Sequence, residues 1–404
     1  MNDRTAAEPG GNGDGSSKLF RDLTGIGVNW RDALLVPLLA VITALAVGVV
    51  VIALTDIDAL RMWGNDPGGA FDKTWDTIWG AYQALFVGSF GSLRAISETL
   101  VGAAPLILAG LSVAIGFRAG LFNIGTEGQM LVGGMFALYV GITVHLPIVI
   151  HLPLALLVGA IGGAIWGGIP GLLRARTGAH EVITTIMMNF IALRLVDYFL
   201  KTTLYQVPGR DDPVSQNVDV SARLPRLFGY LDRSDVRVSA GIILALLMAY
   251  AIYWLLFRST LGFEFRAVGY NPDGAHYAGM NVTWLYIGVM AIAGAMGGLA
   301  GSNQILGVLY RGTPGFSGGL GFDAIALALL GRSHPAGVVA AGLLFGALRA
   351  GGQEMQVATD VSIDLILVIQ ALVVVFIAAP ALIRAIYRVK TGEGAEQVTR
   401  GWAA

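Results

Sequence analysis

The residues that commonly carry out covalent or metal chemistry are scarce in this chain. It has no cysteine, and its five histidines form no HExxH pair; His180 is followed by Glu181, but the sequence then continues VITTI. The lysines close no GxxxxGKS or GxxxxGKT loop, which would cradle the phosphates of ATP; they are Lys18, Lys73, Lys201 and Lys390. We therefore expect a protein that is not an enzyme and binds no metal or cofactor itself, so that any ATP-driven work falls to a partner.

A first polar stretch, FRAGLFNIGTEGQ at 117–129, lies between two long apolar runs. Irregular backbone is tolerated at membrane depth only where it is buried in protein or lines a wet cavity, so we expect a short or re-entrant segment near 118–128. Glu127 would cost about 2.5–3.5 kcal/mol in the lipid centre, so it should face protein or water. Either Asn123 and Glu127 border a permeation pathway near its cytoplasmic end, or Glu127 forms a packing pair with Arg118.

A second polar set, Glu181, Thr185 and Asn189, is spaced four residues apart and so forms one stripe on a helix. Such a stripe in a membrane helix points into the bundle or toward a water-filled path. Its amide and hydroxyl groups suit an uncharged solute, with hydrogen bonding between helices as the alternative. Arg194 and Asp197 are three residues apart and are expected to neutralise each other.

Further pathway candidates lie toward the C-terminus. Asn303 and Gln304 end an apolar block, and Gln370 lies within the last one. The glycines between 312 and 321 are typical of a broken or re-entrant segment, which we expect near 317–331. Asp323 is either a ligand for solute hydroxyls or, as we favour, the N-cap of its own helix.

The sequence FRSTLGFEFRAVGYNPDGAHYAGMN contains the signals of a short helix over 272–278. Asn271 is a good N-cap, Pro272 suits the first helical position, and Asp273 complements the helix dipole. Gly279 can end the helix in a left-handed conformation. These signals predict a two-turn helix outside the membrane, with a well-capped surface loop as the alternative.

The composition indicates the kind of protein that positions these residues. The chain is 55% hydrophobic and 13% charged, with mean hydropathy +0.68, whereas soluble domains are about 25% charged. Its apolar blocks approach the roughly 20 residues that cross a bilayer as a helix, which predicts an all-α polytopic membrane protein. The blocks are 33–54, 99–117, 129–146, 153–173, 181–200, 238–257, 283–302, 317–331, 335–351 and 362–384. The net charge of −1 gives no reason to expect a nucleic-acid partner.

Ten spans place both termini on one side, and the basic run RAIYRVK after the last span favours the cytoplasm. We expect a transmembrane domain at 33–384, with 201–237 as an external loop. The Gly-, Asp- and Ser-rich residues 1–32 predict a disordered cytoplasmic tail, and 385–404 a second one. Three aromatic residues are expected to anchor the chain at the membrane surface before the second span: Trp75, Trp79 and Tyr82.

Several of these stretches resemble a known family. GFEFRAVGYNPDGAHYAGMN resembles the coupling segment of ATP-binding-cassette (ABC) importer permeases of the branched-chain amino acid, ribose and nucleoside group. FRAGLFNIGTEGQMLVGG, EVITTIMMNFIA and GFDAIALALLGRSHPAGVVAAGLLFGALRAG resemble more narrowly the nucleoside permeases of that group. The resemblance covers roughly residues 95–384.

The resemblance implies a type II importer permease fold of about ten helices, forming half of a transmembrane dimer in a bacterial cytoplasmic membrane. The expected partners are an ATPase subunit that uses ATP and Mg, an extracytoplasmic substrate-binding lipoprotein, and a second homologous permease. A heterodimer is expected, with a homodimer as the alternative. Within 258–282, coupling to the ATPase is carried over to Arg266, Asn271, Pro272, Asp273, Ala275 and Gly279.

Other transport functions remain open at this point. A permease for ribose, other simple sugars or branched-chain amino acids would share this skeleton. An ion-coupled secondary transporter would need an intramembrane carboxylate, and Glu98, Glu127, Asp197 and Asp323 are available. The capped helix at 272–278 argues against a secondary transporter, which has no ATPase to engage.

Overall fold

The computed structural model describes residues 30–228, 235–359, 364–378, 383 and 386–387, and this part is helical apart from two isolated β-bridges. The elements are α2 (Trp30–Thr55), α3 (Ile57–Met62), α4 (Pro67–Phe90), α5 (Leu93–Arg118), α6 (Thr126–Thr143), α7 (Ile148–Thr177), α8 (Glu181–Phe199), η1 (Val220–Ala222), α9 (Gly241–Arg258), α10 (Thr260–Tyr270), α11 (Pro272–Tyr277), α12 (Val282–Asn303), the π-helix η3 (Gln304–Leu309), α13 (Leu320–Leu330), α14 (Pro335–Thr359) and α15 (Asp364–Ala378). The two predicted tails lie almost wholly outside the described residues.

The prediction of an all-helical polytopic membrane protein is confirmed. Seven helical stretches in the described part are long and apolar enough to cross a membrane: Leu38–Thr55, Leu93–Arg118, Ile148–Thr177, Glu181–Phe199, Gly241–Arg258, Val282–Leu309 and Pro335–Thr359. Two shorter apolar helices, Leu320–Leu330 and Asp364–Phe376, accompany them.

Three of the central helices, α6, α7 and α12, meet backbone to backbone. A Cβ on Gly133 of α6 would overlap the Cα of Gly298 on α12, and a Cβ on Gly163 of α7 would overlap the carbonyl of Gly294. Small residues allow this close approach in membranes, where packing rather than the hydrophobic effect holds helices together. The result is a rigid bundle against which the neighbouring helices are positioned.

Helix α4 was not predicted. Asp66 caps it by accepting a hydrogen bond from the Gly69 amide, and the expected aromatic anchors lie along it, Trp75 and Trp79 exposed. The hydroxyl of Tyr82 instead donates to the Leu45 carbonyl of α2 at 2.7 Å. Helix α4 packs closely on α14, so its partner in the fold is distant in sequence.

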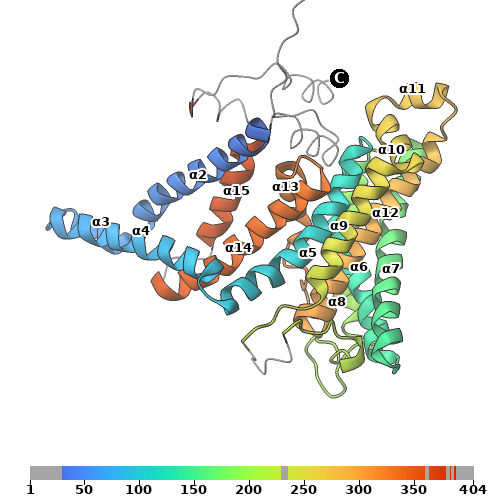
Figure 1. Cartoon of the computed structure of the whole chain (residues 1–404). Helices are drawn as coiled ribbons and strands as arrows, with labels where there is room; N and C mark the ends of the chain where they lie inside the picture. Colours follow the sequence, from blue (N-terminus) through green and yellow to red (C-terminus); the bar gives the residue numbers. More distant parts are fainter. Residues whose placement is uncertain (1–29, 229–234, 360–363, 379–382, 384–385, 388–404) are drawn as a thin grey trace, which may run out of the picture.

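The bundle has two distinct ends (Figure 1). Helix α11 projects at one end, and the segment that joins α8 to α9 covers the opposite end. Helices α2 and α15 run antiparallel, since Ile52 packs with Ile366 and Ala40 with Ile383. The beginning of α2 and the end of α15 therefore lie together, at the end of the molecule that carries α11 (Figure 1).

Candidate functional site

The stretch between α5 and α6 turns back into the bundle. Gly120 takes a left-handed conformation (φ 71°) just after α5 ends. Helix α6 begins at Thr126, and the hydroxyl of that residue lies 3.2 Å from the hydroxyl of Ser112, well inside α5. Residues 121–125 are therefore non-helical backbone inside protein, the situation in which such backbone is tolerated at membrane depth.

Asn123 secures this turn from within. Its side chain is fully buried, and its Oδ1 accepts from the Gly125 amide at 3.0 Å and from Nε2 of Gln129 at 3.1 Å. Its Nδ2 donates to Oγ of Ser112 at 3.3 Å. The amide thus supplies hydrogen bonds that the irregular backbone and the facing helix require.

Glu127 links α6 to α13. It is 3% exposed, and it accepts hydrogen bonds from the Ser317 hydroxyl and, at 2.9 Å, from the Gly321 amide. Gly321 lies in the first turn of α13, where amide groups lack helical partners, so Glu127 caps that helix from another one. The predicted pair with Arg118 is wrong, because Arg118 lies at the end of α5 and donates to the carbonyl of Ser333 at 2.8 Å.

The stripe on α8 is confirmed as a buried face. Oδ1 of Asn189 accepts from the Gly128 amide at 2.8 Å, and its Nδ2 donates to the Ile124 carbonyl at 2.9 Å. Thr185 donates to a carbonyl of its own helix, and Glu181 lies 3.4 Å from Nε of Arg174. These contacts hold the irregular stretch 121–125, which we call the re-entrant turn, against α8. The exposed pair Arg194–Asp197 also forms, at 3.4 Å.

Asp323 is not the N-cap of α13. The helix begins after Gly319 without a side-chain cap, and Asp323 instead forms an ion pair with Arg349 of α14. The cap comes from Glu127, which is distant in sequence. Asn303 and Gln370 are buried in two other places, at the end of α12 and on α15.

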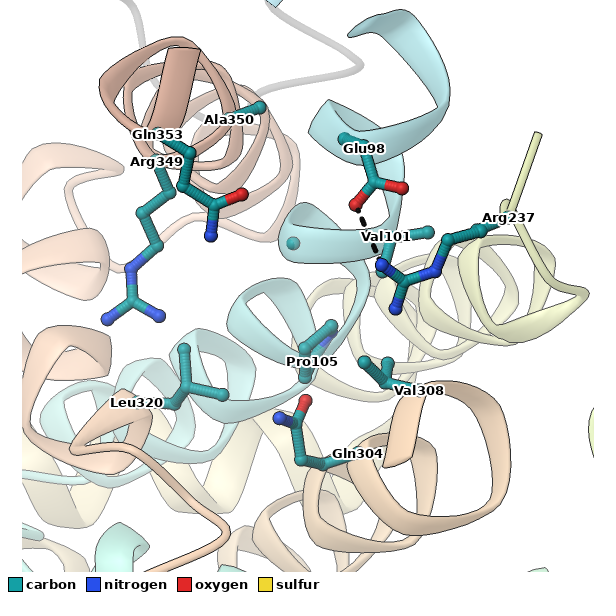
Figure 2. A pocket seen from close by; sticks show the side chains of 11 residues that line it. Glu98, Val101, Pro105, Arg237, Gln304, Val308, Leu320, Arg349, Ala350 and Gln353 are labelled. Atoms are coloured by element: carbon teal, nitrogen blue, oxygen red, sulfur yellow. Dashed lines mark hydrogen bonds and ion pairs between the residues drawn. The ribbon is translucent and has the colours of Figure 1, made fainter. Parts of the chain in front are cut away.

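A cavity of about 200 Å³ lies where α5, α13, α14 and η3 meet the chain before α9 (Figure 2). Of the eight predicted pathway residues, Gln304 is the one among its lining residues. The cavity's other polar side chains come from α5, from α14 and from the chain before α9, and Figure 2 shows them around one space: Glu98, Arg237, Arg349 and Gln353.

The polar groups of this cavity are held from several elements. Oε2 of Glu98 lies 3.5 Å from Nη1 of Arg237, with the two side chains 23% and 46% exposed. The hydroxyl of Ser97 accepts from the backbone amides of Arg237 and Val238, both at 2.8 Å, which fixes this part of the chain on α5. Gln304 begins the π-helix, a distortion found frequently at functional sites.

A second cavity of about 330 Å³ adjoins the first. The two share Glu98, Ala350 and Gln353, and the second adds Arg94 and Glu354 at the ends of α5 and α14. Together they form one polar cleft between α5 and α14. Gln353 is exposed, so the cleft opens at the surface of the chain.

Most of this cleft was not predicted from the sequence. Glu98 was expected only as an available carboxylate for an ion-coupled transporter, and Arg237 only as the end of the loop 201–237. Arg349 and Gln353 share one face of α14 because they are four residues apart. The predicted apolar block in this region was 335–351, whereas α14 continues to Thr359. Gln353 therefore lay outside the predicted block.

The predicted capped helix is confirmed as α11, ending one residue earlier than expected. Oδ1 of Asn271 accepts from the Gly274 amide at 2.9 Å, and Pro272 is the first helical residue. Gly279 is left-handed (φ 86°), and the next amide donates to the Ala275 carbonyl at 3.0 Å, which closes the helix. Ala275 is buried, while Asp273 is exposed.

Helix α10, which precedes α11, rests on the turn after α5. A Cβ on Gly269 would lie 2.5 Å from the Arg118 carbonyl, and a Cβ on Gly120 would lie 3.1 Å from Cα of Gly269. The guanidinium groups of Arg118 and Arg266 lie 5.4 and 5.3 Å from the centre of the Phe257 ring. The segment that carries α11 is therefore packed directly against α5 and α9.

Comparison with known proteins agrees with this architecture. The family described as "Branched-chain amino acid transport system / permease component" matches residues 95–378. The guanosine ABC transporter permease protein NupP of Bacillus subtilis is 40% identical over 352 residues, which cover 87% of this chain and 94% of NupP. The glucose ABC transporter permease protein TsgB13 of Haloferax volcanii is 37% identical over 346 residues, which cover 84% of this chain and 86% of TsgB13.

A third relative, the nucleoside ABC transporter permease protein NupB of Lactococcus lactis, is 33% identical and covers 88% of this chain and 93% of NupB. No solved structure matches the chain. The family match spans well over half of the chain, and the relatives agree with it along most of their length. The chain thus belongs to this family of permease components, and it is a membrane-spanning permease of an ABC transporter rather than an enzyme.

Proposed function

We propose that this permease imports nucleosides, forming half of a translocation pathway that a separate ATPase drives. The similarity to NupP and NupB supports nucleosides as the solute. The capped helix α11 supports the proposal that a separate ATPase drives transport. A short helix closed at both ends is a rigid element, and its outer surface is free to enter a groove on another protein. The ATPase would use ATP and Mg, whereas this chain binds neither.

The coupling segment has the contacts that this role requires. Asn271, Pro272 and Asp273 are exposed at the start of α11, and the Tyr277 side chain at its end is 91% exposed. Gly279 ends the helix in a left-handed conformation. Because α10 rests on the turn after α5, a movement of α11 would reach α5, which lines the polar cleft.

The proposed topology follows from the two ends of the bundle. The end with α11 faces the cytoplasm and the ATPase, so both termini are cytoplasmic. The opposite end, with 201–237, receives solute from an extracytoplasmic binding lipoprotein. The proposed crossing elements are the ten that correspond to the predicted blocks, with α4 lying on the external side because α2 ends and α5 begins there. The membrane is a bacterial cytoplasmic membrane.

We assign the predicted pathway residues to two levels of this topology. Asn123, Glu127, Thr185 and Asn189 hold the cytoplasmic end of the pathway closed through the re-entrant turn. At the level of the cleft, Gln304 lines the cavity and Asp323 forms an ion pair with Arg349 beside it, while Asn303 and Gln370 are buried elsewhere in the bundle.

A second homologous permease would complete the pathway, because the cleft opens at the surface of this chain. A heterodimer is the proposed form. Co-purification distinguishes a heterodimer from a homodimer. Two differently tagged copies of this chain are expressed together with the adjacent permease. A heterodimer predicts that each copy co-purifies with the other permease, while a homodimer predicts that the two tags co-purify.

The test of function is uptake of labelled uridine, adenosine, ribose and leucine in a host without its own carriers. The host carries this permease with its partner permease, ATPase and binding protein, and a parallel strain carries an ATPase that cannot hydrolyse ATP. Nucleoside uptake that disappears with the inactive ATPase is the expected result. Asp273→Lys should also abolish uptake while the protein remains in the membrane.

Two other results would replace the proposal. Uptake of ribose alone would favour a sugar permease, which the similarity to TsgB13 makes the second candidate. Nucleoside uptake that is unaffected by the inactive ATPase and by Asp273→Lys would indicate an ion-coupled transporter instead.

A further inference from the structure

We infer that the cavity beside Glu98 is the site at which the permease recognises the base of its solute. The inference rests on the proposed function, to which it adds where the solute binds and which part of the solute is recognised. The cavity lies in the deeper part of the cleft, between α5 and the π-helix after α12. A solute released at the external end would reach it through the adjoining cavity, with which it shares Glu98 and Gln353.

The cavity is lined by both polar and apolar side chains. Figure 2 shows the polar groups of Glu98, Arg237 and Gln304 directed into the same space as the apolar side chains. The apolar residues that line it are Val101, Pro105, Val308, Leu320 and Ala350. A solute that fits must therefore combine an apolar surface with a hydrogen-bonding edge.

A nucleobase has this combination, because its two faces are apolar and its edge carries donors and acceptors. A simple sugar has hydroxyl groups around its whole ring. Placing some of them against the aliphatic side chains would leave buried hydroxyl groups without hydrogen-bond partners, which is unfavourable. The lining of the cavity thus favours the base over the sugar as the part that is read here.

The polar groups of the cavity are of the kinds that bind the edges of bases in protein–nucleic acid complexes. A carboxylate accepts from amino groups of bases, a guanidinium donates to ring nitrogens and carbonyls, and a carboxamide does both. Glu98 and Arg237 touch through one oxygen and one nitrogen at 3.5 Å, and both side chains are partly exposed to the cavity. A base edge can bridge the pair by donating to Glu98 and accepting from Arg237, with Gln353 beside them.

Ser97 is a positioning residue for this site. Its hydroxyl accepts from two successive backbone amides at Arg237 and Val238, and it thereby holds the backbone of Arg237 on α5, beside Glu98. Gln304 is positioned in a different way, by the switch from α-helix to π-helix at that residue. The two sides of the site are therefore held by different elements, α5 and η3.

The test uses the absence of cysteine in this chain. Ala350→Cys places a single thiol on the wall shared by the two cavities, and Asp197→Cys places one on the exposed end of α8 as a control. The rate of labelling by a small methanethiosulfonate reagent is measured on the assembled transporter with a cysteine-free partner permease, ATPase and binding protein. Uridine, adenosine, their free bases and ribose are the added probes.

The nucleosides and free bases should slow labelling at Ala350→Cys at least fivefold, and ribose should not. Adding Glu98→Gln should remove most of that protection, since one good contact to a base is worth about 1–3 kcal/mol, or roughly 5- to 150-fold. Labelling at Asp197→Cys should not respond to any probe. Purified Glu98→Gln protein with an unchanged melting temperature excludes misfolding as the cause.

Three results would overturn the inference. Nucleosides that are imported in an ATP-dependent manner but leave labelling at Ala350→Cys unchanged would place the base elsewhere. Protection by ribose equal to that by the bases would show that the cavity reads the sugar. Protection that persists in Glu98→Gln and in Gln353→Ala would exclude these side chains from recognition. In each case ATP-dependent uptake by the unaltered permease still decides the proposed function separately.

Discussion

The cap that Glu127 provides for α13 gives the most direct quantitative test of this structure. Glu127 is buried and accepts from the Ser317 hydroxyl and the Gly321 amide. Glu127→Ala leaves both donors buried without a partner, and each such group costs about 1–3 kcal/mol. The expected destabilisation is therefore about 2–6 kcal/mol, whereas Glu127→Gln keeps one acceptor oxygen and should lose about half as much.

The assay is thermal unfolding of the purified permease in detergent, followed by the loss of the monodisperse species. A change of 1 kcal/mol shifts the melting temperature by about 2–4 °C in proteins of 150–250 residues and by less in a longer chain. With 404 residues, Glu127→Ala should lower the apparent melting temperature by roughly 3–10 °C. Asp76→Ala removes an exposed carboxylate of α4 and should have almost no effect.

A double-mutant cycle with Ser317→Ala separates the cap from other effects of the substitution. If Glu127 and Ser317 act together, the two changes should be non-additive by about 0.5–3 kcal/mol. Additive effects would show that the pair does not interact. A melting temperature of Glu127→Ala equal to that of Asp76→Ala would refute the assignment of Glu127 as the cap.

Three further predictions concern other contacts. Asn189→Ala leaves one amide and one carbonyl of the re-entrant turn unpaired, so it should destabilise the protein by about 2–6 kcal/mol, while Asn189→Gln should not restore the melting temperature. Gly269→Ala should clash with the turn after α5 and abolish uptake, whereas Gly168→Ala, whose Cβ would lie 4.0 Å from Cβ of Ala291, should retain it. Burial, followed by the charge of Arg118, lowers the pKa of His334 to about 4. As the pH falls from about 6.5 to 4, the unfolded chain therefore binds a proton at this side chain before the folded protein does. Stability should therefore fall as the pH decreases from about 6.5 to 4, and His334→Gln should show a smaller fall in melting temperature over this range.

Local chemistry along the chain made some elements predictable. Helix α11 could be placed to within one residue because its cap, its first proline and its terminal glycine all lie within nine residues of sequence. The apolar blocks located the helices less closely: seven helical stretches of the described part, rather than ten, are long and apolar enough to cross a membrane. The stripe on α8 was also predictable, since a helix places every fourth residue on one face.

Other features depended on partners that are distant in the sequence. Helix α4 is polar enough at Asp72, Lys73 and Asp76 to conceal its apolar face, and its packing partner α14 lies more than 250 residues further along. Asp323 looked like a cap for its own helix, but Glu127 occupies that role from α6. In both cases a local signal competed with a tertiary contact that the sequence does not display.

The sequence by itself determined that this is a helical membrane protein with a capped helix outside the bundle, because length, hydropathy and capping are properties of neighbouring residues. Only the tertiary structure decided what the polar residues do. It turned Asn123 and Asn189 toward the backbone of a re-entrant turn, and it brought Glu98, Arg237 and Gln353 around one cavity. Buried polar groups must find partners, and the packing of distant helices decides which partners are within reach.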